Sequence, residues 1–315
     1  MKTKLLITGG LGYIGSFTAR SIWRQSKIRS FSIDNLSRGN IFAKKFVDNY
    51  KLCISNNRIK KIITENKINT VLHLAAFTCV RESENKTKQY LDNNYKKQIK
   101  FIDNLNETTV RYFIFASSLS IFEKNKFKKN LSPYSKYKIK IENYLKKIAS
   151  KNFKVVILRY SNVVGSDRNG SLGEKNSHIN RIVPTFYNNI KHKKNNILFF
   201  DFKKKTFPFR NYIHVIDVAN INLKMLSNYK KIYRKFSVFN IFNIKYFSNY
   251  EVLKNLSNIL KIKYKFKLKQ ISSIESIKPI YKSGKNIFKY LNYKPRFTDL
   301  KKMLKTNIKW FSKIY

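Results

Sequence analysis

With 315 residues, 43% of them hydrophobic and 26% charged, the chain can bury one large core or two modest ones, which excludes a disordered protein. Its 66 basic and 17 acidic residues give a formal charge of +49, but the lysines recur along the whole chain among Asn, Ile, Tyr and Phe. Because A- and T-rich codons encode these residues, a drift in composition accounts for the charge, and we expect no specific nucleic-acid partner.

The cysteines and the apolar segments indicate in which cellular compartment the protein is found. Cys53 and Cys79 stand 26 residues apart with no further pair, so neither a disulfide framework nor a zinc site is predicted. The apolar run Leu5–Ile7 is too short for a signal peptide, and no stretch reaches the ~18 apolar residues of a membrane helix. We expect a cytoplasmic protein with no membrane partner and no metal. Four histidines lack metal-ligand spacing and are predicted to be structural: His73, His178, His192 and His214.

Strand-like runs alternate with segments of helical spacing through the first half of the chain. These runs are Leu5–Thr8, Phe31–Asp34, Val71–Ala75, Tyr112–Ala116 and Val155–Leu158. The alternation is typical of βαβ units on a parallel sheet. It predicts an α/β fold with a doubly wound, Rossmann-type sheet.

Beyond Gly165 the alternation ends, and a smaller C-terminal α+β portion is predicted to bind substrate. Its elements are strands at Ile197–Phe200, Val238–Ile241 and Lys261–Lys269, and helices after Asp217, from about Tyr250 and from about Thr298. We therefore divide the chain into a Rossmann domain at 1–165, to which 210–245 contributes back, and a substrate domain at 166–209 and 246–315.

A glycine-rich turn follows the first strand. Of nine glycines in the chain, four fall within seven residues: Gly9, Gly10, Gly12 and Gly15. A strand that feeds such a turn and then a helix brings backbone N–H groups and the positive helix end onto a pyrophosphate. The turn therefore predicts a dinucleotide-binding site.

Asp34 bears on which dinucleotide the turn binds, NAD or NADP. It ends the second strand, 19 residues past Gly15, where a carboxylate can bind both ribose hydroxyls and would repel a 2′-phosphate. This favours NAD over NADP. Arg38 keeps NADP open, because an arginine can accept that phosphate.

Tyr134 and Lys138 stand four residues apart at the start of the helical segment Tyr134–Ala149, so both side chains share one face. An ammonium group near a phenol stabilises the phenolate and makes the tyrosine a usable base. The same spacing also begins at Tyr187, Tyr250, Tyr281 and Tyr290. Only the pair at 134 follows a strand whose Ser117–Ser118 tip opens at the ligand-binding edge of the sheet.

With these motifs the chain resembles the extended short-chain dehydrogenase/reductase family and, within it, the UDP-glucose 4-epimerases, nearly end to end. The matching segments are ITGGLGYIGS at 7–16, DNLSRGN at 34–40, VLHLAAFTCVRES at 71–83, YLDNN at 90–94, FASSLSIF at 115–122, SPYSKYK at 132–138, LRYSNVVGSD at 158–167 and RNYIHVIDVA at 210–219. The resemblance implies an isomerase that uses NAD to invert C4 of a UDP-hexose, interconverting UDP-glucose and UDP-galactose through a 4-keto sugar.

The resemblance also implies the site residues. Catalysis falls to Ser118, Tyr134 and Lys138. Cofactor contacts are implied for Gly9, Gly12, Tyr13, Ile14, Gly15, Asp34, Asn35, Leu74, Ala75, Ala76, Asn93, Tyr134, Lys138 and Tyr160. Substrate contacts are implied for Ser118, Asn162, Ile182 and Arg210. A homodimer is implied through the helices that carry Tyr95–Leu105 and Tyr134–Ala149.

The chain departs from the family in several places. A lysine often found in the third segment is replaced by Thr78, and the usual adenine contact is replaced around Cys53–Ile54. A second phosphate-binding arginine has no counterpart, because the alignment reaches Ser273 there and Lys278 is the closest cation. Lysine lacks the bidentate fork of arginine, so weaker substrate binding is expected.

Other functions remain open. A 4-epimerase acting on UDP-N-acetylglucosamine or UDP-glucuronate fits the same motifs, because the alignment around Pro279–Tyr281, where pocket size is set, is uncertain. A 4,6-dehydratase would need a carboxylate that Ser118–Ser120 does not offer. A non-catalytic scaffold that binds polyanions through its charge has no use for Ser118, Tyr134 and Lys138 together.

Overall fold

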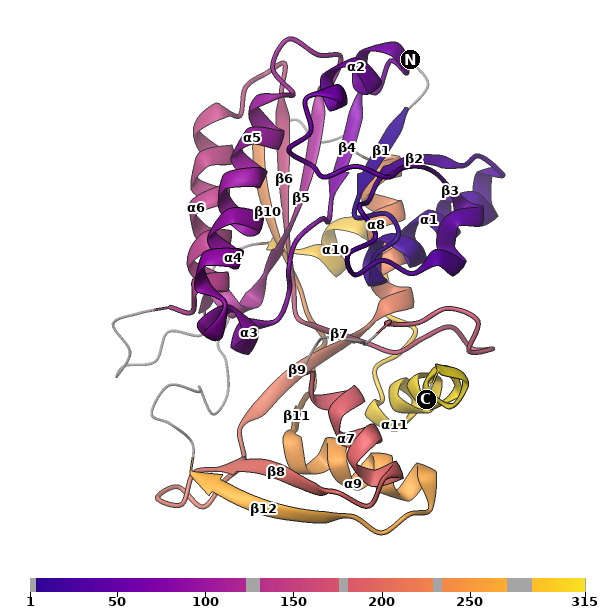
Figure 1. The fold of residues 1–315 in the computed structure, drawn as a ribbon, viewed down its shortest axis with the longest axis vertical. Coiled ribbons are helices and arrows are strands. Elements are labelled where there is room, and N and C mark those ends of the chain that lie inside the picture. Colours follow the sequence, from indigo (N-terminus) through magenta and orange to yellow (C-terminus); the bar gives the residue numbers. More distant parts are fainter. Residues whose placement is uncertain (1–3, 123–130, 176–180, 229–233, 271–284, 315) are drawn as a thin grey trace.

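A computed structural model gives the structure of the chain and describes residues 4–122, 131–175, 181–228, 234–270 and 285–314. Figure 1 shows two lobes along the long axis, a larger one built on a sheet flanked by helices and a smaller one below it. No helix among these residues is long and apolar enough to cross a membrane.

The larger lobe holds an eight-stranded parallel sheet in the order β13-β10-β6-β5-β4-β1-β2-β3. Its strands are β1 (Leu5–Thr8), β2 (Ser30–Ile33), β3 (Val47–Tyr50), β4 (Thr70–His73), β5 (Tyr112–Ser118), β6 (Lys154–Tyr160), β10 (Phe236–Ile241) and β13 (Lys285–Asn286). The strand order reverses beside β1, and ligands bind at the carboxyl ends of the strands at such a point.

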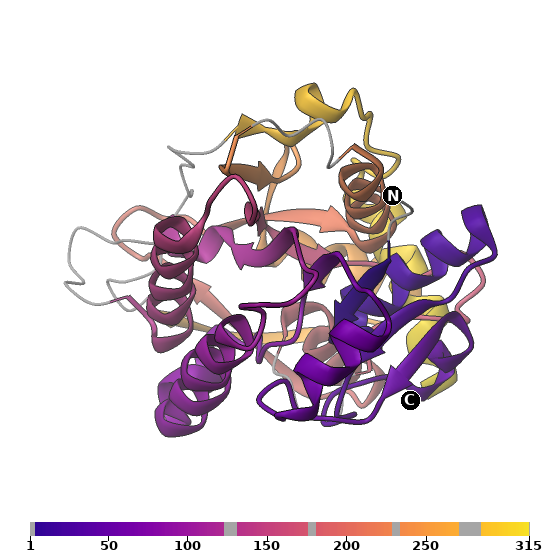
Figure 2. The same ribbon diagram turned by 90° about the horizontal axis from the view of Figure 1, so that it is seen from above.

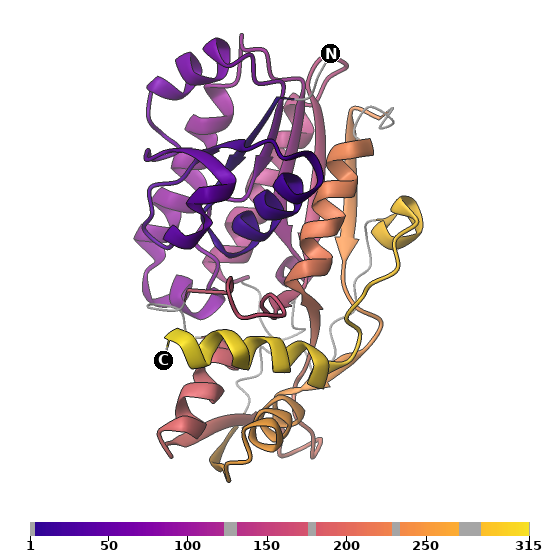
Figure 3. The ribbon, with the colours of Figure 1, turned by 90° about the vertical axis from the view of Figure 1, so that its right-hand side faces the viewer.

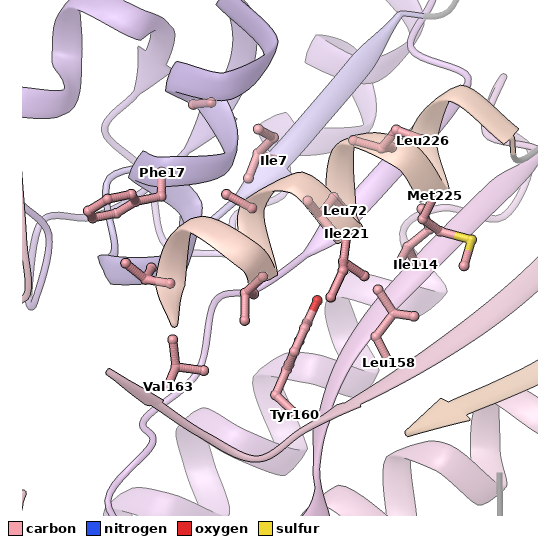
Figure 4. Packing of buried hydrophobic residues seen from close by; sticks show 14 of the residues in the cluster. Ile7, Phe17, Leu72, Ile114, Leu158, Tyr160, Val163, Ile221, Met225 and Leu226 are labelled. Carbon is pink, nitrogen blue, oxygen red and sulfur yellow. The ribbon is translucent and has the colours of Figure 1, made fainter. Parts of the chain in front are cut away.

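Helices cover both faces of this sheet (Figure 2). One face carries α1 (Tyr13–Ser26), α8 (Val215–Asn228) and α10 (Ile287–Leu291), and the other carries α2 (Arg58–Glu65), α5 (Lys97–Asp103) and α6 (Pro133–Ile148). Figure 4 shows Ile221 and Met225 of α8 packing toward Ile114 and Leu158 of the sheet. Each such aliphatic side chain contributes about 1.5–3 kcal/mol on burial. The burial of both faces explains why the strands are almost continuously apolar.

Short helical turns connect the strands near the carboxyl edge of the sheet. They are η1 (Ile41–Phe46), α3 (Val80–Asn85), α4 (Thr87–Leu91), the π-helical turn η2 (Asp92–Lys96) and η3 (Leu119–Phe122). A π-helical turn is uncommon and is often found at functional sites.

The smaller lobe joins two small sheets to three helices. Its elements are β7 (Asn162–Val164), β9 (Phe209–His214) and β11 (Tyr246–Ser248) in one sheet, β8 (Asn195–Phe200) and β12 (Lys265–Gln270) in the other, and α7 (Ile182–Lys191), α9 (Asn249–Leu260) and α11 (Leu300–Ile314). Ser248 and Glu251 form a capping box that starts α9. Phe186, Leu256 and Met303 lie in the core that these helices share.

Helix α11 runs between the two lobes (Figure 3). The side chain of Asn307 accepts a hydrogen bond from the Gly165 amide at 2.8 Å, and Thr306 accepts one from the Ser166 amide at 3.0 Å. The C-terminal helix therefore fixes the segment in which the chain leaves the large sheet.

The predicted α/β class, with a doubly wound parallel sheet and a smaller C-terminal portion, is confirmed. Sequence patterns missed β3, β7, β11 and β13, because strands of two to four residues carry too little alternation, and they also missed the six-residue strand β9. The predicted strand at Lys261–Lys269 begins only at Lys265, because Lys261 takes a left-handed conformation that ends α9. The predicted domain boundaries stay a prediction. Within the range 246–315, β13 pairs with β10 of the large sheet.

Candidate active site

A cleft of about 750 Å³ opens between the lobes at the carboxyl edge of the large sheet. Every residue predicted to act in catalysis or in binding lines this cleft. They are Gly9, Gly12, Tyr13, Ile14, Gly15, Asp34, Asn35, Leu74, Ala75, Ala76, Asn93, Ser118, Tyr134, Lys138, Tyr160, Asn162, Ile182 and Arg210. Their roles stay predictions, but the fold brings all of them to one place.

The glycine turn is packed too closely for side chains. Gly9 has φ +68°, and a Cβ there would lie 2.9 Å from the backbone of Ala75. A Cβ on Gly15 would lie 2.1 Å from the carbonyl oxygen of Gly9. The Gly12 amide donates to that same oxygen at 3.0 Å, and α1 begins at the next residue. The free amides of the first turn of α1 therefore lie at the cleft, where they can bind a diphosphate.

Asp34 lies just past β2, at the cleft wall. Its two carboxylate oxygens accept hydrogen bonds from the amides of Leu11 at 3.0 Å and Leu36 at 2.8 Å. Burial raises the pKa of Asp34, and these hydrogen bonds oppose the rise. The carboxylate is thus held beside the glycine turn, in the position that binds a ribose in Rossmann folds.

Arg38 is engaged within the protein. Its Nη2 donates to both carboxylate oxygens of Glu82, at 2.9 and 2.7 Å, and its guanidinium lies 4.1 Å from the ring centroid of Phe77. The Tyr90 hydroxyl also donates to Glu82, at 2.9 Å. Because Arg38 already has a carboxylate partner, it does not offer an unpaired charge to a 2′-phosphate, which supports the choice of NAD.

Ser118, Tyr134 and Lys138 come from two adjacent elements. Ser118 ends β5, while Tyr134 and Lys138 lie one turn apart on α6. Ser132 caps this helix by accepting a hydrogen bond from the Ser135 amide at 3.2 Å, and Pro133 takes its first position. The cap therefore sets where α6 begins and puts Tyr134 in its first turn.

Lys138 is buried with few partners. Its Nζ donates to the Ala116 carbonyl at 2.6 Å and lies 5.9 Å from the ring centroid of Tyr134. Burial lowers the pKa of Lys138 to about 8. A lysine with a lowered pKa beside a tyrosine is an arrangement that can act in acid/base chemistry, and this role stays a prediction here.

A buried ion pair holds α6 against the sheet. Glu142, one turn beyond Lys138, accepts hydrogen bonds from Arg159 Nε at 3.0 Å and Nη2 at 2.5 Å. The Ser117 hydroxyl donates to the same carboxylate. Both charged side chains are about nine-tenths buried. The pair links α6 to β5 and β6, the strands that carry Ser118 and Tyr160.

A polar network lies behind the wall at Leu74–Ala76. The imidazole of His73 bonds Thr8 Oγ1 at 2.7 Å on one side and Gln98 on the other. The Gln98 amide donates to the carbonyls of Ala75 at 2.8 Å and Asn93 at 3.1 Å. Burial lowers the pKa of His73 to about 3, so the ring stays neutral and joins β4 to the π-helical turn η2.

The predicted substrate side is more open. Asn162 is exposed, and its amide donates to the Asn211 carbonyl at 3.1 Å, next to Arg210 on β9. Ile182 begins α7. Tyr160 differs from this set, because its hydroxyl donates to Asn222 at 2.7 Å inside the core. Its ring can line the cleft, but its hydroxyl is already bonded.

Sequence reasoning missed a further charged pair in the cleft. Arg181, just before α7, pairs with Glu174 at 3.1 Å and donates to Thr78 Oγ1 at 2.9 Å. It therefore connects the smaller lobe to the segment after β4. No local motif marks Arg181 or Glu174, although Thr78 stands where a lysine had been expected.

Some predictions fall outside the described residues. These concern His178 and the segments at Ser273, Lys278 and Pro279–Tyr281. Among the described residues no group of three potential metal ligands comes together, and both cysteines are free thiols. His214 is buried like His73, whereas His192 bonds only the Asn188 carbonyl at the end of α7.

The fold and the cleft define a Rossmann-type enzyme in which a dinucleotide-binding glycine turn and the Tyr134/Lys138 pair line one cleft. The NAD dependent epimerase/dehydratase family matches residues 5–243 of the chain. UDP-glucose 4-epimerase from Pasteurella multocida is 30% identical over 289 residues, covering 83% of this chain and 84% of that protein. The enzyme of the same name from Streptococcus mutans is 26% identical over 328 residues, covering 98% and 96%. The chain belongs to the NAD dependent epimerase/dehydratase family, and its cofactor is NAD.

Solved structures extend the likeness over nearly the whole chain. UDP-glucose 4-epimerase from Bifidobacterium longum, in complex with NAD⁺ and UDP, matches with a TM-score of 0.87 at 23% identity, covering 99% of this chain and 98% of that one. The UDP-Glc/GlcNAc 4-epimerase from Campylobacter jejuni matches with a TM-score of 0.80 at 25% identity, covering 99% and 100%. These matches confirm the two-lobed fold.

Proposed function

We propose that the protein is an NAD-dependent isomerase that inverts C4 of a UDP-hexose and interconverts UDP-glucose and UDP-galactose. One observation carries the proposal. Ser118, Tyr134 and Lys138 line the same cleft as the glycine turn and Arg210. The curated relatives, named UDP-glucose 4-epimerase and matched over nearly the whole chain, support it.

The chain's own residues can then perform the proton transfers. NAD, when bound, supplies reversible hydride acceptance from C4 of the sugar. Tyr134 takes the proton from the sugar O4 and later returns it, while Ser118 hydrogen-bonds that oxygen. Lys138 stabilises the phenolate of Tyr134 by its charge and binds the nicotinamide ribose. The glycine turn and Asp34 hold the cofactor in place through both half-reactions.

Substrate binding relies on fewer groups. Arg210 can bind the diphosphate of the UDP-sugar through charge-assisted hydrogen bonds, and Asn162 lies next to its strand. The 4-keto intermediate has to turn over before C4 is reduced from its other face. An open substrate side with few fixed contacts is compatible with such a rotation.

We also assign the enzyme to galactose metabolism in the cytoplasm, acting as a homodimer. Two free cysteines are compatible with that compartment. The turn η2, which leads into α5, packs against α6 with the rings of Tyr95 and Tyr137 stacked at 6.0 Å, and Ile99 is half-buried on α5. An Ile99→Glu variant should sediment as a monomer if this face joins two copies. An unchanged dimer would exclude the face.

The test of the activity compares the wild type with Tyr134→Phe. With UDP-galactose and trace NAD, the wild type should form UDP-glucose without net build-up of NADH, as measured by chromatography and absorbance. Loss of the phenolic hydroxyl should lower the rate by about 10²–10⁴-fold. Tyr137→Phe is a matched control, because Tyr137 is as buried on the same helix but does not line the cleft.

The remaining outcomes are equally informative. Turnover of UDP-N-acetylglucosamine or UDP-glucuronate, but not of UDP-galactose, would keep the mechanism and change the hexose. Equal activity of Tyr134→Phe and the wild type would contradict the assigned base. A folded, NAD-bound protein that converts none of these sugars would contradict the whole proposal.

A further inference from the structure

A second cavity, of about 560 Å³, lies outside the cleft. Its walls come from α1, α8, the segment 167–169 after β7 and Arg296–Phe297 just before α11. Helices α1 and α8 lie side by side in Figures 1 and 3. The cavity shares no lining residue with the catalytic cleft.

The basic residues in this wall are all arginines, namely Arg20, Arg24, Arg168 and Arg296, and we call the cavity the arginine pocket. The chain contains only 13 arginines against 53 lysines. A drift in composition that favours lysine explains charge in general, but it does not explain four arginines and no lysine around one cavity. Arginine differs from lysine in its planar fork, which binds oxyanions bidentately.

Of the four guanidinium groups, only that of Arg20 has a carboxylate partner among the described residues. Arg20 is buried and pairs with Asp167 at 3.1 Å. Arg24, Arg168 and Arg296 are exposed, and no described carboxylate forms an ion pair with any of them. A lysine would serve equally well at the C-terminal turn of α1, where Arg24 lies. Helix electrostatics therefore do not account for the arginine.

Asp167 does not cancel this charge. Its carboxylate already accepts hydrogen bonds from the Ser171 amide at 2.6 Å, the Ser171 hydroxyl at 2.5 Å and the Leu172 amide at 3.0 Å. The carboxylate of Asp167 therefore stabilises the loop at Ser171–Leu172 and pairs with Arg20. Three positive charges therefore face one small cavity, and a bound anion would relieve their mutual repulsion.

We propose that the arginine pocket is a binding site for a small ligand with a phosphate or diphosphate group. The cavity volume lies within the range of small-molecule sites. Guanidinium forks match phosphate oxygens, and Ser21, Gln25 and Asn220 add neutral hydrogen-bonding groups to the wall. The site is separate from the catalytic cleft and does not depend on the proposed reaction.

The test is calorimetric titration of the full-length protein with inorganic pyrophosphate. It is done at 150 mM salt, because screening at about that ionic strength suppresses binding to the diffuse charge of the chain. NAD and UDP are kept in excess to fill the catalytic cleft. Binding should be stoichiometric and at least tenfold weaker in Arg24→Gln/Arg296→Gln. The matched control is Arg58→Gln/Arg234→Gln, which removes two exposed arginines away from the pocket and should bind like the wild type.

A third variant separates geometry from charge. Arg24→Lys/Arg296→Lys keeps the net charge but replaces the planar guanidinium forks. Because lysine lacks the fork, this variant should bind pyrophosphate several-fold more weakly than the wild type. Circular dichroism confirms that each variant is folded. Equal affinity in the pocket and control variants, or only weak non-stoichiometric heats in the wild type, would overturn the proposal.

Discussion

The cofactor side and the substrate side of the cleft are built differently. On the cofactor side, Gly9 and Gly15 allow backbone segments to touch, and Lys138 is almost fully buried. On the substrate side, Asn162 is exposed and Arg210 lies half-buried on β9, the central strand of a small sheet. The first is made largely of main chain and core, and the second of side chains at the surface of a cleft.

This difference explains where the chain keeps to its family and where it departs. A backbone contact has no substitute, so the glycine turn is retained even in a chain with only nine glycines. A side-chain charge can be supplied from elsewhere. Arg181, held by Glu174 against Thr78, puts a cation beside the position where a lysine had been expected.

The largest expected effect is on the cofactor side. In Gly15→Ala the new Cβ would meet the Gly9 carbonyl oxygen at 2.1 Å, so the turn has to open. We expect NAD to bind about 100-fold more weakly, measured by titration of the apoprotein. Gly173→Ala is the matched control, because its Cβ would meet the Trp310 side chain at 2.4 Å, outside the glycine turn. Similar affinities of the two variants would mean that close packing of the turn is not what binds NAD.

Next comes the ion pair behind α6. Glu142→Gln leaves the buried Arg159 without a counter-charge, and we expect the free energy of unfolding to fall by about 2 kcal/mol. Urea denaturation measures this change. Glu107→Gln removes an exposed pair with Lys60, which water and salt screen, and should leave the free energy of unfolding nearly unchanged. A larger loss in the exposed variant would contradict the contrast drawn between buried and surface groups.

A smaller effect is expected on the substrate side. Arg210→Lys keeps the charge but loses the fork, so UDP should bind about tenfold more weakly. NAD affinity should stay as it is. Calorimetric titration with each nucleotide separates the two, and a loss of NAD affinity would show that the two sides of the cleft are not independent.

The smallest effect concerns pH. Because burial lowers the pKa of Lys138 to about 8, its charge is lost as pH rises through that value, and kcat/KM should fall about threefold between pH 7.5 and 8.5. The contribution of Lys138 to folding stability changes with pH in the opposite direction to the rate. The pKa of the unfolded state lies near 10.5, so burial of the charged group disfavours folding below about pH 8, and this cost disappears as the pH rises from about 8 to 10.5. Lys138→Arg should abolish the alkaline fall in rate, and a persistent fall would assign it to another group.

Local patterns were sufficient to predict the parallel sheet and the cofactor side. Strand β1, the glycine turn and α1 follow one another in the sequence, and Tyr134 and Lys138 share one helix. The fold class needs only the alternation of strands and helices. The glycine turn and the Tyr134/Lys138 pair are each local in the sequence, and the sheet follows from a pattern that repeats along the chain.

Features that depend on distant contacts could not be predicted. Arg38 pairs with Glu82, 44 residues away, and Arg181 bonds Thr78, 103 residues away. The arginine pocket joins α1 to Arg296, near the opposite end of the chain. The only trace of these contacts in the sequence is the residue type, an arginine in a chain that otherwise prefers lysine.

The placement of α11 has a consequence for synthesis. Asn307 holds Gly165, and β10 and β13 extend a sheet whose first strand begins at residue 5. The ribosome releases the chain from its N-terminus, so the glycine turn and α6 emerge long before the helix that ties the two lobes together. The cleft can be completed only after residue 307 has left the ribosome, and until then its half-built apolar surfaces are open to chaperones and to aggregation.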